Sequence, residues 1–423
     1  MDVAWEAYMK RTAKILFGSA LIGLVTVGSA AAEDTVKVAF IDPLSGPFAT
    51  TGTNGLAEWR YAVENLVNAK GGVLGKKMEV VAFDNKISPK ESLIQLKVAI
   101  DQGIRFIAQG NSSGVANALT DAIKKHNKRN PDKRVIFINY SAVDPALTNK
   151  KCNFWHFRFD ANADIKMDAL TDVMKDDKSI DKVYVIGQDY SFGKAVAKAA
   201  VTNIKKKMPN AKIVGNELHP IGKVKDFTPY ARKIMAAGAN AVITGNWGAD
   251  MVGLGKAVIQ AGYKGPIYTY YAAATGITKT FGKEGKDVIR LVQEGPLNPP
   301  ATERTSNYIN GFKKKYPQFD ITQARITNAA EMLAKAINKA GTATDMVKIG
   351  TALEGMEHDS IWGGKIMMRA KDHQAIQDVH ISVHTDDKIQ HDLDNSGFGL
   401  MKESTVVNAG ANSPTSCKMK RPS

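Results

Sequence analysis

The sequence lacks several features that mark other classes of protein. No basic stretch is interleaved with aromatic residues or fits a nucleic-acid-binding motif, although the formal net charge is +15. Lysine-rich stretches such as residues 205–207 lie on predicted helix faces, so we interpret the charge as a solvated basic surface. We therefore expect no nucleic-acid partner, and only weak steering of anionic ligands by this charge.

Apolar stretches long enough to span a membrane are absent as well, and the one apolar run near the N-terminus has a different character. Three basic residues precede the apolar residues 15–27, which lead into Ser29-Ala30-Ala31-Ala32. This order is typical of a secretory signal peptide, and the run is too short for a comfortable membrane span. We predict a signal peptide over residues 1–32 and a soluble, exported protein.

Cysteine is scarce, with Cys152 and Cys417 as the two examples. In an exported protein an isolated pair is more often bridged than free, so we predict a disulfide; two free thiols are the alternative. The bridge would tie a C-terminal extension, residues 386–423, back to the middle of the chain. From Asn395 onwards this extension is polar, so Cys417 is its only expected anchor.

What the chain does contain is a repeated alternation of apolar, strand-like runs and helical segments. This alternation predicts parallel sheets built from βαβ units. It occurs in two blocks. From about residue 291 the pattern suggests that the chain returns to the first block, with helices and then a strand pair near residues 365–369 and 375–385. The expected strands of the two blocks lie at residues 36–41, 78–83, 105–109, 134–139, 183–187, 212–218, 241–245 and 266–271.

The most informative turn is Gly110-Asn111-Ser112-Ser113-Gly114, between an expected strand and an expected helix. Ligands of α/β sheets bind at such turns, and a helix start offers unpaired N–H groups and the positive end of its dipole. With two added hydroxyls, the turn suits a carboxylate or a phosphate. Two alternatives stay open: a nucleophile elbow, with Ser112 serving an exported serine hydrolase, and a plain turn with an N-cap.

Several motifs follow one another in a recognisable order. They are Pro43-Leu44-Ser45-Gly46-Pro47, the serine turn, Ser141-Ala142-Val143-Asp144-Pro145, Asp189-Tyr190-Ser191-Phe192-Gly193 and Trp362-Gly363-Gly364. Over nearly the whole chain after residue 32, this set resembles the solute-binding proteins of branched-chain amino-acid ABC importers. The resemblance implies the type I periplasmic binding fold, in which two Rossmann-like α/β lobes with parallel central sheets are joined by a hinge and close on a ligand.

The resemblance also implies a role and a division of the chain. The protein would be a periplasmic monomer that delivers a small carboxylate ligand to membrane permease subunits, with no catalysis, no cofactor and no metal. Lobe 1 would comprise residues 33–158 together with 291–385, and lobe 2 residues 159–290.

Site residues follow from the positions that match the family. The first lobe would hold the ligand carboxylate, and the second would supply mainly aromatic contacts; core packing is the alternative for these aromatic residues, but they lie at turns. The expected first-lobe residues are Thr50, Thr51, Ser112, Ser113, Ser141, Ala142 and Val143. The expected second-lobe residues are Tyr190, Phe192, Asn246, Trp247 and Tyr271.

Two departures bear on the ligand. The family holds an α-ammonium group with a threonine hydroxyl and an acidic side chain, but Val143 takes the threonine position and the stretch 270–274 contains no acid. A buried ammonium group without a charged partner is costly. We therefore hypothesise a carboxylate that lacks the amino group, such as an aromatic acid. An amino-acid ligand would need Asp144 or Asp189 as its partner.

Two further signals concern charged and metal-binding side chains. Arg158 is expected near the hinge, either as a structural residue or as a counter-charge for the carboxylate. Histidines gather late in the chain, but their spacing across a strand pair does not converge on one point, so we expect a solvated strand pair and no metal site. They are His373, His380, His384 and His391.

Overall fold

The computed structural model describes residues 35–422, so the predicted signal peptide over residues 1–32 lies outside the described residues. Within the described range, no helix is long and apolar enough to cross a membrane.

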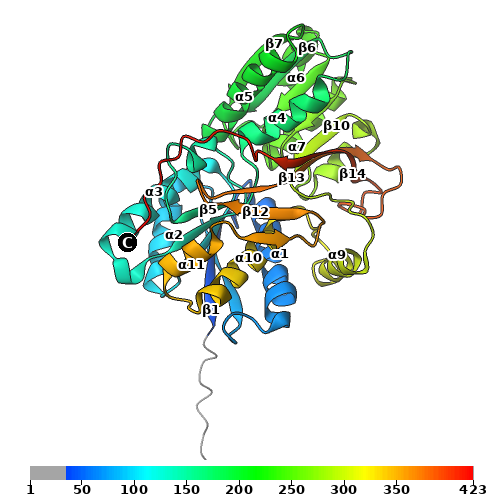
Figure 1. The fold of residues 1–423 in the computed structure, drawn as a ribbon. Coiled ribbons are helices and arrows are strands. Elements are labelled where there is room, and N and C mark those ends of the chain that lie inside the picture. Colours follow the sequence, from blue (N-terminus) through cyan, green and yellow to red (C-terminus); the bar gives the residue numbers. More distant parts are fainter. Residues whose placement is uncertain (1–34, 423) are drawn as a thin grey trace, which may run out of the picture. The chain divides into compact units, whose positions relative to one another are not determined.

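Five parallel strands form the first sheet, in the order β2-β1-β3-β4-β5; β1 and β5 are labelled in Figure 1. The central strands β3 and β4 are buried along their whole length, as expected when helices cover both faces of a parallel sheet. The strands are β1 Val36–Asp42, β2 Met78–Asp84, β3 Phe106–Gln109, β4 Ile136–Asn139 and β5 His156–Arg158. The helices packed with this sheet are α1 Ala49–Ala62, α2 Pro89–Asp101, α3 Ser113–Arg129, α10 Arg325–Ala340 and α11 Met346–Leu353.

The second sheet repeats the pattern, in the order β10-β9-β8-β6-β7. Its strands are β6 Lys182–Gln188, β7 Lys212–His219, β8 Ala241–Thr244, β9 Ile267–Thr269 and β10 Ile289–Gln293. Its helices are α4 Ala163–Met174, α5 Ser191–Lys207, α6 Thr228–Ala236, α7 Ala249–Gln260 and α8 Ile277–Phe281, and α9 Glu303–Lys315 follows β10. The predicted α/β architecture with parallel sheets is confirmed.

One long strand, β13 (Gln374–Thr385), connects the two sheets. Its first residue pairs with Arg158 of β5, and residues further along pair antiparallel with β10. The short strand β12 (Lys365–Arg369) pairs antiparallel with the start of β13, and β11 (Glu357–Asp359) pairs antiparallel with β12. The predicted boundary between residues 290 and 291 is therefore wrong at the level of strands. It cuts through β10, which completes the second sheet because Ile289, Leu291 and Val292 are buried there.

The C-terminal extension also differs from the prediction. Residues Gly399–Ala409 form β14, which pairs antiparallel with most of β13, so Cys417 is not the only anchor. Much of β14 faces solvent, which explains why its hydrophobicity did not reveal it; main-chain hydrogen bonds hold it to its neighbour. The predicted disulfide between Cys152 and Cys417 is present and ties the segment after β14 to the loop before β5.

Strand β13 is buried rather than solvated along almost its whole length. Within it, His380 and His384 are 8% and 1% exposed, so the expectation of a solvated strand pair is wrong. His373, in the turn before β13, is fully buried and stacks on Phe157. Among residues 35–422, no group of His, Cys, Asp or Glu side chains is arranged to hold a metal ion.

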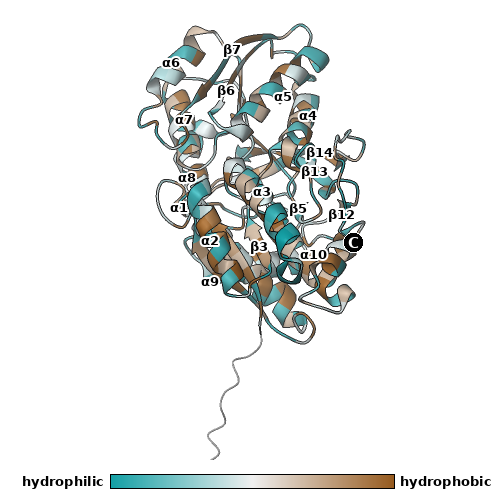
Figure 2. Ribbon diagram, turned by 90° about the vertical axis from the view of Figure 1, so that its left-hand side faces the viewer, coloured by the Kyte–Doolittle hydropathy of each residue, from teal (hydrophilic) through white to brown (hydrophobic). Residues whose placement is uncertain are grey.

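Several residues of helix α2 are hydrophobic, as the colouring of Figure 2 shows, and three of them are exposed. Leu93, Ile94 and Val98 are between about a third and a half exposed. The helix therefore presents an apolar strip that the described part of the chain leaves uncovered.

Candidate ligand-binding site

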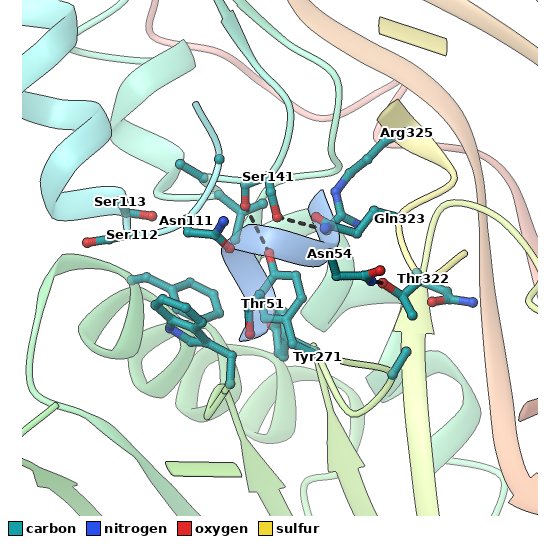
Figure 3. A pocket seen from close by; sticks show the side chains of 18 of the residues that line it. Thr51, Asn54, Asn111, Ser112, Ser113, Ser141, Tyr271, Thr322, Gln323 and Arg325 are labelled. Atoms are coloured by element: carbon teal, nitrogen blue, oxygen red, sulfur yellow. Dashed lines mark hydrogen bonds between the residues drawn. The ribbon is translucent and has the colours of Figure 1, made fainter. Parts of the chain in front are cut away.

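A pocket of about 620 Å³, its open mouth included, lies where the carboxyl ends of strands from both sheets meet (Figure 3). This is the place where ligands bind in open α/β sheets. It is lined by Thr51, Asn54, Gly110, Asn111, Ser112, Ser113, Ser141, Ala142, Val143, Tyr190, Phe192, Trp247, Tyr270, Tyr271, Ala273, Leu291, Gln293, Thr322, Gln323 and Arg325.

The turn after β3 is held in place by a buried carboxylate. Asp42, at the end of β1, accepts hydrogen bonds from the backbone N–H groups of Gly110 and Asn111 at 3.0 and 2.9 Å and from the Tyr140 hydroxyl at 2.6 Å. Burial raises the pKa of Asp42 to about 7, although these three donors act in the opposite direction. The turn is thus fixed from behind, on the side away from the pocket.

The next residues form the start of α3. Ser112 has a φ of 79°, an uncommon conformation for serine that such a tight turn imposes, and its side chain does not cap the helix. Ser113 Oγ accepts from the Asp144 backbone N–H at 3.2 Å, which leaves its own proton for a ligand. The first N–H groups of α3 and the positive end of its dipole complete an anion-binding end of the pocket.

The loop after β4 offers fewer free backbone N–H groups to a ligand than the family resemblance implies. The N–H groups of Ser141 and Ala142 both donate to Asn139 Oδ1, at 3.2 and 2.7 Å. The Val143 N–H takes part in none of the hydrogen bonds formed within the described chain. We therefore expect Val143, rather than its two predecessors, to offer a backbone donor to a ligand.

The opposite wall comes from the second sheet and is aromatic. The indole N–H of Trp247 donates to the Tyr190 hydroxyl at 2.9 Å, and the ring of Phe192 lies edge-on to Tyr270 and Tyr271, with centroids 5.5 and 5.7 Å apart. These contacts fix the rings to one another. The wall is therefore a preformed apolar surface with hydroxyl groups at its edges.

Two contacts bring the walls together across the pocket. The Tyr271 hydroxyl donates to the Ser141 carbonyl at 3.1 Å, and it also lies 3.2 Å from Asp160 Oδ2. Phe48, just before α1, packs on Trp247 with ring centroids 4.3 Å apart. The two walls are therefore in direct contact across the pocket.

A buried cluster of four charged side chains lies beside the pocket. Arg325 Nη1 donates to Glu294 Oε1 at 2.7 Å, and Lys166 Nζ lies 2.7 Å from Asp160 Oδ1 and 3.6 Å from Glu294 Oε2. All four side chains are at most 4% exposed. Two cations and two anions balance, and although burial opposes its charged form, Arg325 and Lys166 keep the pKa of Glu294 below its usual range.

Most predicted site residues line this pocket, and two do not. Thr50 is exposed on α1 and is not among the lining residues. Asn246 is fully buried, and its amide nitrogen lies 2.9 Å from Nε2 of His219, so it belongs to the interior of the second sheet region. These two placements are corrections; that the lining residues bind a ligand stays a prediction.

The charged residues considered for other roles also lie outside the lining. Asp144 caps a short 3-10 helix through Ala146 and accepts from Asn117 at 2.8 Å, while Asp189 pairs with Lys194 at the surface. Arg158 is fully buried in β5 and donates to Gln374 at 2.8 Å and to the Asp144 carbonyl at 2.7 Å. It is a structural residue at the junction of the two sheets.

Sequence reasoning missed one end of the pocket. The missed residues are Asn54, Gln293, Thr322, Gln323 and Arg325. One signal was available, because Arg325 opens α10, and a cation in the first turn of a helix opposes the helix dipole. The ion pairs of Arg325 with Glu294 and Asp160 compensate this unfavourable position.

The periplasmic binding protein family matches residues 35–387 of the chain. Leu/Ile/Val-binding protein homolog 4 of Brucella abortus (strain 2308) is 31% identical over 415 residues, which cover 96% of this chain and 98% of that protein. The chain belongs to the substrate-binding proteins of branched-chain amino-acid ABC transporters. Its family resemblance, drawn from ordered motifs, is thereby confirmed.

Solved structures agree with this membership. The Leu/Ile/Val/Thr/Ala-binding protein from Brucella ovis, in its closed conformation, has a TM-score of 0.81 and 30% identity, covering 92% of this chain and all of that one. A solute-binding protein of an ABC transporter from Rhodopseudomonas palustris HaA2, in complex with p-hydroxybenzoic acid, has a TM-score of 0.76 at 19% identity, covering 90% and 100% of the two chains. The second likeness concerns the fold alone.

Proposed function

We propose that the protein is the periplasmic solute-binding component of an ABC importer and that its ligand is a small carboxylate without an α-amino group. The observation that carries this proposal is the lack of acidic side chains in the lining of the pocket. Among its lining residues Arg325 is the single ionised side chain, and no aspartate or glutamate lines it.

The carboxylate fits at the start of α3. Ser113 offers its N–H and its hydroxyl proton there, Val143 offers its N–H, and the Ser112 hydroxyl lies beside them. Hydrogen bonds from such donors to an anion are among the stronger ones. Closure of the aromatic wall over the ligand would then exclude water and strengthen them.

An α-ammonium group would find no comparable partner. It would leave water for a pocket whose lining contains no carboxylate. Asp144 and Asp189 are engaged elsewhere, and the nearby Asp160 and Glu294 already pair with Lys166 and Arg325. A buried charge without a partner costs several kcal/mol, on the order of a thousandfold in affinity. Aromatic acids avoid this cost and offer a ring to the wall formed with Trp247 and Tyr190.

The relatives leave the ligand class to be decided by this site. The Brucella proteins carry branched-chain amino acids in their names, whereas the Rhodopseudomonas structure holds an aromatic acid in the same fold. Both chemistries are therefore compatible with the architecture. The uncharged lining around the serine turn favours the second for this chain.

The hydrolase alternative has less support. A nucleophilic serine needs a base within hydrogen-bond reach, and no histidine lines the pocket in the described part of the chain. We propose binding without turnover. The purified protein incubated with aromatic esters should release no product beyond the uncatalysed rate, and product release that disappears in Ser112→Ala would favour the hydrolase.

The ligand class can be tested with pairs of compounds that differ by the amino group. Thermal shift and calorimetric titration would compare phenylalanine with phenylpropanoate, and leucine with methylpentanoate, because a ligand of the folded state raises the melting temperature. We expect the acid of each pair to bind at least about tenfold more tightly than its amino counterpart. Tighter binding of both amino acids would overturn the proposal.

A further inference from the structure

The pocket has a second polar end, which the proposed carboxylate does not use. Asn54, Gln323 and Arg325, here called the distal patch, lie on the side of the pocket opposite Ser112 and Ser113 (Figure 3). Asn54 is 1%, Gln323 6% and Arg325 4% exposed. Buried polar groups at a pocket wall are expected to have partners, so the atoms left over describe what a ligand must bring.

Asn54 leaves an acceptor. Its Nδ2 lies 3.1 Å from Glu58 Oε1, 3.1 Å from the Asp320 carbonyl and 2.9 Å from Thr322 Oγ1, while its Oδ1 is buried with no partner. Turning the amide over would place Oδ1 against the carboxylate and the carbonyl. The orientation is therefore fixed, and the lone oxygen points away from these acceptors.

Arg325 and Gln323 leave donors. The Arg325 Nη2 group donates to Ser141 Oγ and to Gln323 Oε1, both at 2.8 Å, and Nη1 donates to Glu294. A guanidinium group has five N–H bonds; Nε lies 3.6 Å from Asp160 Oδ2 in an ion pair, so one N–H of Nη1 remains. The Nε2 of Gln323 takes part in none of the hydrogen bonds formed among residues 35–422.

These leftover atoms select one kind of chemical group. An ammonium group would face the Arg325 guanidinium, and a second carboxylate would face the unpaired Asn54 oxygen. A neutral hydroxyl accepts from Arg325 or Gln323 and donates to Asn54, which satisfies both sides. We infer that the distal patch binds a hydroxyl group of the ligand, which makes the ligand class hydroxylated aromatic acids.

This inference rests on the proposed function for the position of the carboxylate. The Tyr271 side chain, whose hydroxyl contacts Ser141, stands between the two ends (Figure 3). A flat ring lying against this side chain would reach from the serine turn towards the distal patch. The carboxylate and the hydroxyl would then sit at opposite ends of the ring.

The test compares ligands with and without the hydroxyl in several variants. Calorimetric titration of the purified protein would use benzoate with para-hydroxybenzoate and phenylpropanoate with its para-hydroxy derivative. In the wild type we expect the hydroxyl to tighten binding about tenfold, as a hydrogen bond involving a charged donor does. In Gln323→Met and in Asn54→Ala, we expect this ratio to fall to about twofold or less.

The ratio within one variant is the readout, so a general loss of affinity or stability does not imitate the effect. Gln260→Met, at an exposed position of α7, is the matched control and should keep the wild-type ratio. No gain from the hydroxyl in the wild type, or a gain that survives in both distal variants, would overturn the inference. Terephthalate binding more tightly than para-hydroxybenzoate would overturn it too.

Failure here is distinguishable from failure of the proposed function. If phenylpropanoate binds more tightly than phenylalanine but its hydroxyl adds nothing, the proposed function stands and the distal patch has no such role. If phenylalanine binds more tightly, the proposed function fails. In that case tyrosine and phenylalanine are compared in the same variants. The ratio of their affinities then shows whether the distal patch binds the hydroxyl group.

Discussion

The two walls of the pocket are built differently. The wall from the first sheet offers backbone N–H groups, hydroxyls and amides on tight turns that follow buried strands, with Asp42 holding the serine turn from behind. The wall from the second sheet offers mainly aromatic rings that support one another. The first wall is suited to fixing the orientation of a ligand, and the second to supplying contact area and shape.

This difference suggests an order of events. A polar end that is fully formed within the first sheet can bind a carboxylate before closure, because its donors belong to one lobe. In the proposed hinge closure the aromatic wall would contribute afterwards, through contacts such as that of Phe48 with Trp247. The first wall would then set the affinity for any carboxylate, and the second would select among carboxylates by shape. The following changes test this division of roles.

The largest expected effect is at the charge cluster beside both walls. Arg325→Met leaves Glu294 and Asp160 with Lys166 as their one close cation, and removing one partner of a buried ion pair costs about 3–5 kcal/mol of unfolding free energy. Urea denaturation would measure it. Arg304→Met removes a half-exposed partner from Glu331, which keeps Lys70 and His358; it is the control and should cost no more than about 1 kcal/mol. Equal losses of unfolding free energy in the two variants would show that the buried cluster stabilises the protein no more than a surface ion pair does.

The disulfide should separate stability from recognition. Replacing Cys152 and Cys417 by serine removes a link closing a long loop, with an expected loss of about 2–4 kcal/mol. Ligand affinity should remain within about twofold, because neither cysteine lines the pocket. Denaturation and titration on the same samples would check both. A large change in affinity would mean that the segment after β14 influences closure.

Trp247→Ala should weaken the aromatic wall in a way that depends on the ligand. Loss of the ring removes the contact with Phe48 and the hydrogen bond to Tyr190, and we expect affinity for aromatic acids to fall about hundredfold. Small aliphatic acids should lose much less. Titration with both groups of ligands tests this, and an equal loss for both would contradict the division between the walls.

The smallest expected effect is at the first wall. Ser113→Ala removes one hydroxyl donor while the backbone donors of α3 stay, so affinity should fall about tenfold or less. The loss should be the same for every carboxylate, whatever its ring. Thr50→Ala, an exposed hydroxyl on α1, is the matched control. A loss that varies with the ring would place Ser113 among the residues that select the ligand's shape.

The parts of the site that the sequence predicted share one property, which is that local pattern determines them. The serine turn and the aromatic turn at Tyr190 and Phe192 follow strands whose apolar runs are continuous, so their place at the carboxyl edge could be inferred. The same holds for the alternation of strands and helices that predicted the fold.

The parts that were missed depend on distant partners. Arg325 reaches the pocket because Glu294 and Asp160 compensate its charge, and no local pattern links these positions. Strand β14 was missed because half of it faces solvent, and its stability comes from pairing with β13. Asn246 and Trp247 were predicted together, but only Trp247 lines the pocket, because the side chain of Asn246 is engaged with His219.

The long connecting strand β13 has a consequence for the time course of folding. Its first residue pairs with Arg158 and residues further along pair with β10, and the nearby disulfide closes a separation of 265 residues. Contacts this distant in sequence raise the contact order, and folding rates fall as contact order rises. We expect the local βαβ units of each sheet to form early and the junction last, so the pocket, which needs both sheets, would be the final feature to appear during refolding.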